Sequence, residues 1–169
     1  LANRVANGAG GGLFDAPIGD TSIGDSTFED NRALNGPGGG LYRAGSGAAI
    51  LVGDTFAGNQ ATGGGGQGGA IFIAATVSPS VMHNCTVSGN VAGDAGGGLF
   101  PEIPIGIESS TFAGNRAITT GGAAIYSPGP AVTLRASIIA NAGIGDSCGG
   151  TLPFASGNDN IDQDGSCGL

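Results

Sequence analysis

Residues 109–117 read SSTFAGNRA, and residues 121–126 then read GGAAIY. This unit recurs along the chain: a Thr–Phe pair or its equivalent precedes an Asn, a small apolar residue follows it, and a glycine cluster then leads to an aliphatic–aromatic pair. Successive Asn residues are 28, 28, 31, 25 and 26 positions apart, so the repeat is regular but allows loops of variable length. The Asn residues that mark the repeat are Asn3, Asn31, Asn59, Asn90, Asn115 and Asn141.

Apolar residues recur at four positions of the repeat, in short segments whose composition is typical of β-strands. Three residues before the Asn are Phe28, Phe56, Val87, Phe112 and Ile138, and two residues after it are Val5, Ala33, Ala61, Ala92 and Ala117. After the glycines come Leu13, Leu41, Ile71, Leu99 and Ile125, and the next unit opens at Ile23, Ile50, Val81, Ile107 and Val132. We expect the three columns of larger residues to form the core, and the small residues of the fourth, Ala-rich column to let a narrow tube close.

A unit of 25 to 31 residues with three brief strands is too short for a βαβ crossover. It fits one rung of a parallel β-helix, in which each strand pairs with its equivalent in the next rung about 4.8 Å away. Gly and Asn tolerate left-handed backbone, so we expect them to mark the corners of the rung. The sequence therefore predicts an all-β solenoid of about five rungs.

The composition agrees with a repeat rather than a flexible chain. The 37 Gly and 8 Pro exceed a quarter of the 169 residues, a fraction that is typical of disorder when these residues are scattered. Here the glycines recur at fixed offsets from the apolar columns. We expect β-helix rungs over residues 1–142, with the first rung incomplete, and a Gly/Asp/Asn-rich terminal segment over residues 143–169.

The charge and the hydropathy of the sequence argue against nucleic-acid binding and against membrane insertion, respectively. The chain carries 13 acidic residues against five Arg and no Lys, which gives a formal net charge of −8. It has no cationic patch to neutralise phosphates, so we expect no nucleic-acid partner. No apolar run reaches the length of about 18 residues that a membrane span needs, so we expect no membrane insertion.

Three cysteines occur, and two of them flank the terminal segment. Cys148 and Cys167 are 19 positions apart, and a disulfide between them is expected to add about 3 kcal/mol of stability in the chain-entropy model. Free thiols and an intermolecular link are the alternatives. An intramolecular disulfide would indicate an oxidising compartment. Cys85 is expected to be an unpaired small residue, because equivalent positions hold Ser26, Asp54 and Ser110.

The elements at residues 110–117 and 121–126 resemble those of the bacterial right-handed parallel β-helix repeat proteins. This broad class of secreted and surface proteins includes polymorphic outer-membrane-type repeats. The tail at residues 156–169 is similar to the segment that follows the last rungs in members with a choice-of-anchor type C-terminal domain. The resemblance implies a right-handed solenoid in an extracellular or cell-surface location, but the fold hosts enzymes, adhesins and inert fibres alike.

One outward column is expected to carry a hydroxyl group in each rung, at Thr27, Thr55, Thr86, Thr111 and Ser137. An ice-binding face would need a wide, flat array of such groups. The neighbouring outward column adds no second file of Thr, since it reads Glu29, Ala57, Ser88, Ala113 and Ile139. Strand propensity and cross-rung contacts are therefore the simpler explanation, and ice binding is the less favoured one.

An aromatic residue follows each core aliphatic, at Phe14, Tyr42, Phe72, Phe100 and Tyr126. Alternation along a strand turns these rings outward or into a corner. Two interpretations remain open. The rings form an exposed platform for sugar rings or a partner protein, or they form a stack covered by loops such as residues 63–66.

Acid–base chemistry would depend on a pair of carboxylates. Glycoside cleavage needs two such groups about 5 to 10 Å apart, and Asp25 and Asp54 lie one column apart on adjacent rungs. The repeat places no Arg or His beside them, and the chain has no Lys to act as a lyase base. Solvated surface acids are the simpler interpretation. His83 has no second His or Cys in metal-ligand spacing, so it is assigned no role.

The terminal segment contains the opening of a calcium-loop pattern at Asn160, Asp162 and Asp164, followed by Gly165. The bidentate Glu of that pattern is expected at the twelfth position, which falls beyond Leu169. Calcium is therefore the weaker hypothesis, and a turn cluster held by the disulfide is the stronger one. We expect no other cofactor.

These observations favour a structural or adhesive module of a secreted or cell-surface bacterial protein over an enzyme. Open rung ends offer unpaired backbone edges, which suggests end-to-end assembly into a fibre. The expected partners are other copies of the chain or a cell-surface polysaccharide or protein. The alternative is a β-helix that binds or degrades polysaccharide as a hydrolase or lyase, with Asp25 and Asp54 as its acids.

Overall fold

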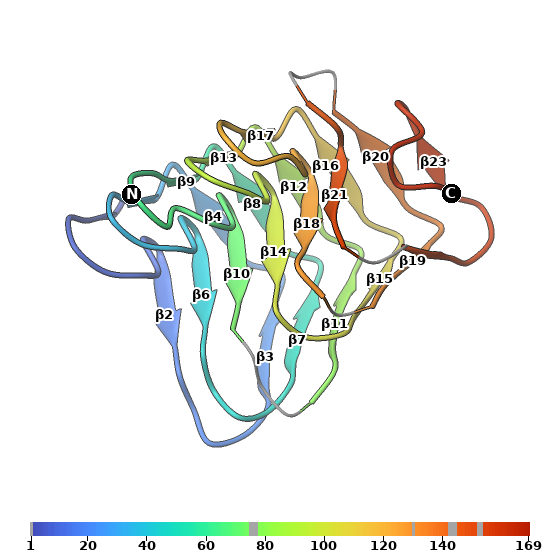
Figure 1. Ribbon diagram of the computed structural model, residues 1–169. Helices are drawn as coiled ribbons and strands as arrows, with labels where there is room; N and C mark the ends of the chain where they lie inside the picture. Colours follow the sequence, from blue (N-terminus) through green and yellow to red (C-terminus); the bar gives the residue numbers. More distant parts are fainter. Residues whose placement is uncertain (1, 75–77, 130, 142–144, 152–153) are drawn as a thin grey trace.

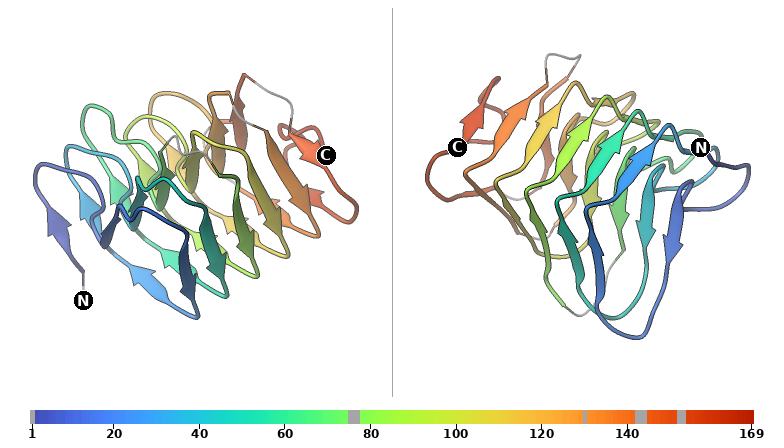
Figure 2. Two further views of the ribbon diagram at one scale, coloured as in Figure 1. Left: turned by 90° about the horizontal axis from the view of Figure 1, so that it is seen from below. Right: turned by 180° about the vertical axis from the view of Figure 1, so that it is seen from behind.

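The computed structural model describes residues 2–169 apart from 75–77, 130, 142–144 and 152–153. The described residues form a column of short parallel strands without a helix. Figures 1 and 2 show the two chain ends at opposite ends of this column. The prediction of an all-β solenoid of about five rungs is confirmed. No helix in the described part of the chain has the length and hydropathy of a membrane span.

Four parallel sheets run along the column. Sheet A holds β1 (Arg4–Val5), β5 (Arg32–Ala33), β9 (Gln60–Ala61), β13 (Val91–Ala92) and β17 (Arg116–Ala117). Sheet B holds β2 (Leu13–Asp15), β6 (Leu41–Arg43), β10 (Ile71–Ile73), β14 (Leu99–Pro101), β18 (Ile125–Ser127) and β21 (Cys148–Gly150). Sheet C holds β3 (Thr21–Gly24), β7 (Ala49–Val52), β11 (Ser80–His83), β15 (Ile105–Glu108), β19 (Val132–Arg135) and β22 (Ala155–Ser156). Sheet D holds β4 (Thr27–Glu29), β8 (Thr55–Ala57), β12 (Thr86–Ser88), β16 (Thr111–Ala113), β20 (Ile138–Ala140) and β23 (Ile161–Asp162).

Each rung passes through the sheets in the order A, B, C, D. Rung 1 is β1–β4, rung 2 is β5–β8, rung 3 is β9–β12, rung 4 is β13–β16 and rung 5 is β17–β20, and β21–β23 form a partial rung 6. The sequence predicted three strands per rung, and that count is wrong. The residues around the Ala column pair as two-residue strands, which are too short to show a strand pattern in the sequence.

The core lies between the four sheets. Phe56, Phe112, Leu41, Leu51 and Ile71 are fully buried, and equivalent residues stack from rung to rung. Burying one such side chain contributes about 1.5–3 kcal/mol. After Val5 in rung 1, the equivalent residue of sheet A is Ala in every rung, so this sheet contributes only small side chains to the interior.

The corner between sheets A and B requires glycine. Gly38 has a φ of 71°, a left-handed backbone that side chains other than glycine rarely adopt. A Cβ atom on the next residue, Gly39, would lie 2.2 Å from the carbonyl oxygen of Gly69 in the following rung. The glycine clusters of the sequence therefore mark a corner at which successive rungs pack backbone against backbone.

The Asn column has a different cause from the one expected. The backbone N–H and Nδ2 of Asn59 both donate to Oδ1 of Asn90, at 2.8 and 3.0 Å, and Asn90 donates in the same way to Asn115, at 3.1 and 2.9 Å. These three residues are fully buried. At the corner between sheets D and A, the residue with a left-handed backbone is the one before the Asn, such as Gly58 with a φ of 64°. The Asn recurs because its side chain satisfies a buried backbone N–H of the preceding rung.

The predicted register is wrong by one residue in rung 5. Ile139, and not Ile138, pairs with Phe112 and is the buried core residue. Ile138 pairs with Thr111 and is 39 % exposed. Ser137 is buried, and its Oγ accepts the backbone N–H of Ser110 at 3.2 Å.

A shortened turn explains this error. In rung 4 a glycine, Gly114, separates the strand residue Ala113 from the ladder residue Asn115. In rung 5 the strand ends at Ala140, directly before Asn141. The spacing from the Asn therefore predicts the residues of β20 one position too early, whereas Ala117 and Ile125 of the same rung pair as predicted.

The predicted core residue at the start of each unit is also wrong in two rungs. Ile50 and Val81 pair with each other on the outer face of sheet C, and Val81 is 45 % exposed. The core positions are the following residues, Leu51 and Met82, which pair with each other and are buried. Both faces of these strands carry apolar residues, so the sequence lacks the alternation of apolar and polar residues that normally shows which face points to the core.

Candidate functional site

The Thr column is an outward ladder on sheet D. Thr27, Thr55, Thr86 and Thr111 are in register, and Ile138 rather than Ser137 continues the column. The neighbouring outward column is Glu29, Ala57, Ser88, Ala113 and Ala140, so Ile139 was misplaced there as well. The two columns therefore offer a single file of Thr hydroxyl groups, with Ser88 as the one hydroxyl residue in the second column.

The aromatic residues form a continuous stack on the outer face of sheet B. Neighbouring ring centroids are 5.2 to 5.4 Å apart from Phe14 to Tyr126. Phe72 and Phe100 are buried, and they cluster with Ala95 from the loop that precedes β14. Phe14, at the N-terminal end, is 57 % exposed. The rings are therefore covered at the centre of the stack, and they are exposed at its N-terminal end.

Asp25 and Asp54 do not share a surface. The side chain of Asp54 is buried, and its Oδ1 accepts the backbone N–H of Ser26 at 2.9 Å. Asp25 is exposed at a left-handed turn with a φ of 50°. Burial raises the pKa of Asp54, and the charge of Asp25 adds to the shift, while hydrogen bonds from the Ser26 and Val52 N–H groups oppose it. Asp54 occupies the buried corner column that holds Cys85, a free buried thiol as expected.

The terminal segment closes the C-terminal end of the core. Cys148 and Cys167 form the predicted disulfide, with their Cα atoms 4.9 Å apart, and both residues are buried. Oγ of Ser166 accepts the backbone N–H of Cys148 at 3.0 Å. The segment is stacked as well as stapled, because β21, β22 and β23 each pair in register with a strand of rung 5.

The three residues of the calcium pattern face separate partners. Asn160 Oδ1 accepts the N–H of Ser137 at 3.0 Å, and Asp162 Oδ2 accepts the N–H of Cys167 at 2.8 Å. Asp164 accepts bonds from the N–H and Oγ of Ser147, at 2.8 and 2.7 Å. No group of three or more His, Cys, Asp or Glu side chains among the described residues is arranged to hold a metal ion.

A buried ion pair that the sequence did not reveal stabilises the loops between sheets B and C. Arg43 is fully buried, and its Nε lies 3.3 Å from Oδ2 of Asp15 in the preceding rung. Its Nη2 donates to the carbonyl oxygens of Gly19 at 2.7 Å and Gly47 at 2.9 Å. One guanidinium therefore joins the loops of rungs 1 and 2.

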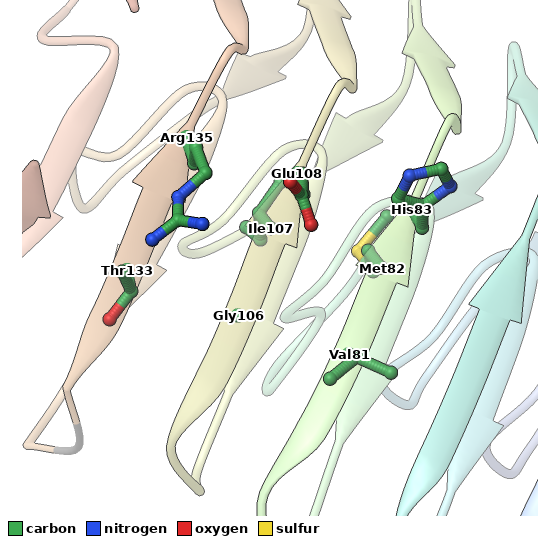
Figure 3. A pocket seen from close by; sticks show the side chains of 8 residues that line it. All are labelled: Val81, Met82, His83, Gly106, Ile107, Glu108, Thr133 and Arg135. Atoms are coloured by element: carbon green, nitrogen blue, oxygen red, sulfur yellow. The ribbon is translucent and has the colours of Figure 1, made fainter. Parts of the chain in front are cut away.

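The outer face of sheet C carries an open depression of about 350 Å³, shown in Figure 3. Its centre is Gly106, which lacks a side chain and pairs in register with Val81 on one side and Thr133 on the other. Two apolar residues, Ile50 and Val52, lie on β7, which pairs with β11 on the side away from Gly106. The depression is thus a gap in an otherwise filled outward column.

Three charged or titratable side chains border this depression. His83, Glu108 and Arg135 occupy the next outward column, on successive strands β11, β15 and β19. All three are exposed, and among the described residues none of their side chains makes a hydrogen bond or ion pair within the chain. These side chains are therefore available to a ligand or partner that approaches sheet C.

The sequence did not reveal this site, although a signal for it was present. The search for metal-ligand spacing considers only His and Cys residues, so it gives His83 no role. Aligning the rungs on sheet C would have placed it beside Glu108 and Arg135, and would have shown Gly106 in a column of larger residues.

Comparison with known proteins finds similarity over one repeat length, from the end of rung 4 into rung 5. The family model of the Chlamydia polymorphic membrane protein repeat matches residues 109–128, which include β16, β17 and β18. No curated protein and no solved structure matches the chain. The match supports a β-helix repeat, in agreement with the fold. The similarity of the tail to choice-of-anchor proteins stays a prediction.

Proposed function

We propose that this chain is a structural or adhesive module of a secreted or cell-surface bacterial protein, and that it does not catalyse a reaction. The observation that carries the proposal is the stacking of outward side chains into continuous columns on sheets B, C and D. Such columns create extended, rigid surfaces, which suit binding to large partners.

Two findings support an extracellular location. The matched repeat is named for a polymorphic membrane protein, so the similarity at residues 109–128 favours a surface protein. The disulfide between Cys148 and Cys167 is typical of proteins from oxidising compartments. We propose on this basis that the module is displayed or released outside the cell.

A polysaccharide is the second candidate partner, with or without cleavage. The exposed ring of Phe14 and the depression around Gly106 favour it, because sugar rings pack against apolar surfaces while their hydroxyl groups bond to polar side chains. Because Asp54 is buried and only Asp25 is exposed, the two carboxylates do not both face a substrate, which favours binding over hydrolysis. Ice binding has less support, because sheet D offers one file of hydroxyl groups.

End-to-end assembly into a fibre also belongs to the proposal, but it needs two open ends. Residues 164–167 cross the C-terminal end through their bonds to Ser147 and Cys148. A head-to-tail fibre therefore requires displacement of the tail. Contacts between the sides of two columns do not.

The purified chain should be tested on an array of neutral and acidic glycans and on whole bacterial cells, with the release of reducing ends measured in parallel. We expect binding without turnover. Turnover that is lost in Asp25→Asn and Asp54→Asn would establish the enzyme alternative. A chain that binds neither cells nor glycans would contradict the adhesive function.

A further inference from the structure

The outer face of sheet C has the shape and charge to fit a copy of itself. Val81 projects from rung 3 and is 45 % exposed, whereas the equivalent position in rung 4, Gly106, leaves the depression shown in Figure 3. In the next outward column, His83 of rung 3 is followed by Glu108 of rung 4. A projection beside a hollow and a basic group beside an acid are the features of a self-complementary surface.

We propose that a second copy of this chain docks face to face on sheet C. The two copies are related by a two-fold axis that is parallel to the strands and lies between rungs 3 and 4. Such an axis reverses the order of the rungs but keeps the strand direction, so each outward column faces its own copy and rung 3 faces the partner's rung 4. Val81 then enters the hollow above the partner's Gly106, and the reciprocal contact forms on the other side of the axis.

The same operation brings the imidazole of one copy opposite the carboxylate of the other. His83 faces the partner's Glu108, and Glu108 faces the partner's His83. Ile50, one rung before Val81, faces the partner's Thr133, and the exposed Val52 is covered by the aliphatic stem of the partner's Arg135. A different occupant, such as a glycan, would use the depression but leave the apolar side chains of rung 2 uncovered.

The size of the face predicts a weak dimer. Strands of four residues and about six rungs give a surface of about 13 by 24 Å, or roughly 300 Å² on each copy. This is less than half of the roughly 800 Å² per partner of a standard stable interface, so we expect a weak and transient dimer. If many copies were displayed on one surface, several such weak contacts could form at once and strengthen the overall binding.

The first test fills the hollow. A side chain can be added at Gly106 without strain, because its Cβ atom would meet only Cγ1 of Val81, at 4.0 Å. Gly106→Phe should therefore fold normally, as judged by circular dichroism and the melting temperature, yet weaken dimerisation at least tenfold in sedimentation equilibrium. Thr86→Phe, which adds the same ring to the outer face of sheet D in rung 3, is the matched control and should dimerise like the parent chain.

The second test reverses the charges. Glu108→Lys should weaken the dimer severalfold, because Lys faces the partner's His83, and His83→Glu should do the same by placing two acids together. The double variant with both changes restores an attractive pair across the axis and should recover dimerisation. Loss in the singles without recovery in the double would contradict the proposed register.

The third test fixes the orientation by cross-linking. In a Cys85→Ser background, mixing Val81→Cys with Gly106→Cys should yield an intermolecular disulfide between the two variants, and neither variant alone should cross-link efficiently. The proposal is overturned if the parent chain is monomeric at about 1 mM, if Gly106→Phe dimerises normally, or if each cysteine variant cross-links to itself. Association that survives Gly106→Phe would indicate contacts through the ends of the column instead.

Discussion

The two ends of the column differ in the residues that continue the core. At the N-terminal end the columns finish in apolar side chains that are only half-buried, namely Val5, Leu13, Ile23 and Phe28. Their equivalents one rung later are fully buried. The apolar residues of rung 1 therefore offer a surface on which further β-structure could stack.

At the C-terminal end the same columns become polar or cross-linked. The Phe column ends in Asp162, the Ile23 column in Ser156 and the Leu13 column in Cys148. A charged residue that points inward at a sheet edge opposes the addition of another strand, because stacking would bury it. The polar residues and the disulfide therefore oppose the addition of a strand at the C-terminal end, whereas the apolar residues of rung 1 do not.

The largest expected effect compares core residues of one column at different depths. Phe112 is fully buried between two rungs, whereas Phe28 stacks on one side only, with its ring 4.7 Å from that of Phe56. We expect Phe112→Ala to cost about 3–5 kcal/mol of unfolding free energy and Phe28→Ala about half of that. Urea unfolding followed by circular dichroism measures both. Equal losses would mean that rung 1 is as well packed as the interior.

The second prediction opens the closed end. Reduction of the Cys148–Cys167 disulfide should lower the unfolding free energy by about 3 kcal/mol. Hydrogen exchange should accelerate first in rung 6 and rung 5, and not in rung 1. The double variant Cys148→Ser/Cys167→Ser should show the same loss and no further response to reductant. Uniform acceleration along the column would show that the disulfide stabilises the whole chain rather than its end.

The third prediction uses two neighbouring acids of the closed end. Burial raises the pKa of Asp162, and the nearby Asp164 adds to this shift. Burial also acts to raise the pKa of Asp164, but hydrogen bonds from Ser166 and Ser147 outweigh it and lower that pKa well below its usual range. Ionised Asp164 therefore stabilises the fold, and ionised Asp162 destabilises it.

The signs of the two effects follow from these directions. The contribution of Asp164 is complete above its unfolded pKa of about 4 and is lost as the pH falls towards its folded pKa, so Asp164→Asn should destabilise the chain at pH 7. Asp162 stabilises the fold only below its unfolded pKa, so Asp162→Asn should stabilise it at pH 7 and not at low pH. Both effects should be below about 1 kcal/mol, because the groups are partly exposed and solvent-screened. Melting temperatures at pH 3 and pH 7 would reveal a reversed sign.

The repeat made much of this fold predictable from the sequence. In a parallel β-helix the residues that pair are equivalent residues of successive rungs, so the stacks at Phe56, Leu41 and Tyr42 could be predicted by alignment alone. The disulfide was predictable because it encloses a segment in which the repeat changes. Neither result needed knowledge of how the rung is folded in space.

Other features depended on information that the repeat does not contain. Ile50 and Leu51 are both apolar, and only the pairing of sheet C shows which of them faces outward. The missing turn residue before Asn141 shifted the register of rung 5. The alignment of His83 with Glu108 across rungs of different length gave the candidate site, and a search for local motifs could not find it.

The smallest expected effect concerns calcium at the closed end. If the pattern at Asn160, Asp162 and Asp164 were a calcium loop, the three side chains would converge on one ion, but each accepts a hydrogen bond from a different backbone N–H. Binding would have to break these bonds, and the ion would gain no group of three carboxylates in return. We expect the melting temperature to change by less than about 1 °C between 5 mM calcium and 5 mM EDTA, since no binding free energy would be coupled to folding. A rise of several degrees that disappears in Asp164→Asn would show instead that the tail rearranges around an ion and that the closed end is held by metal as well as by the disulfide.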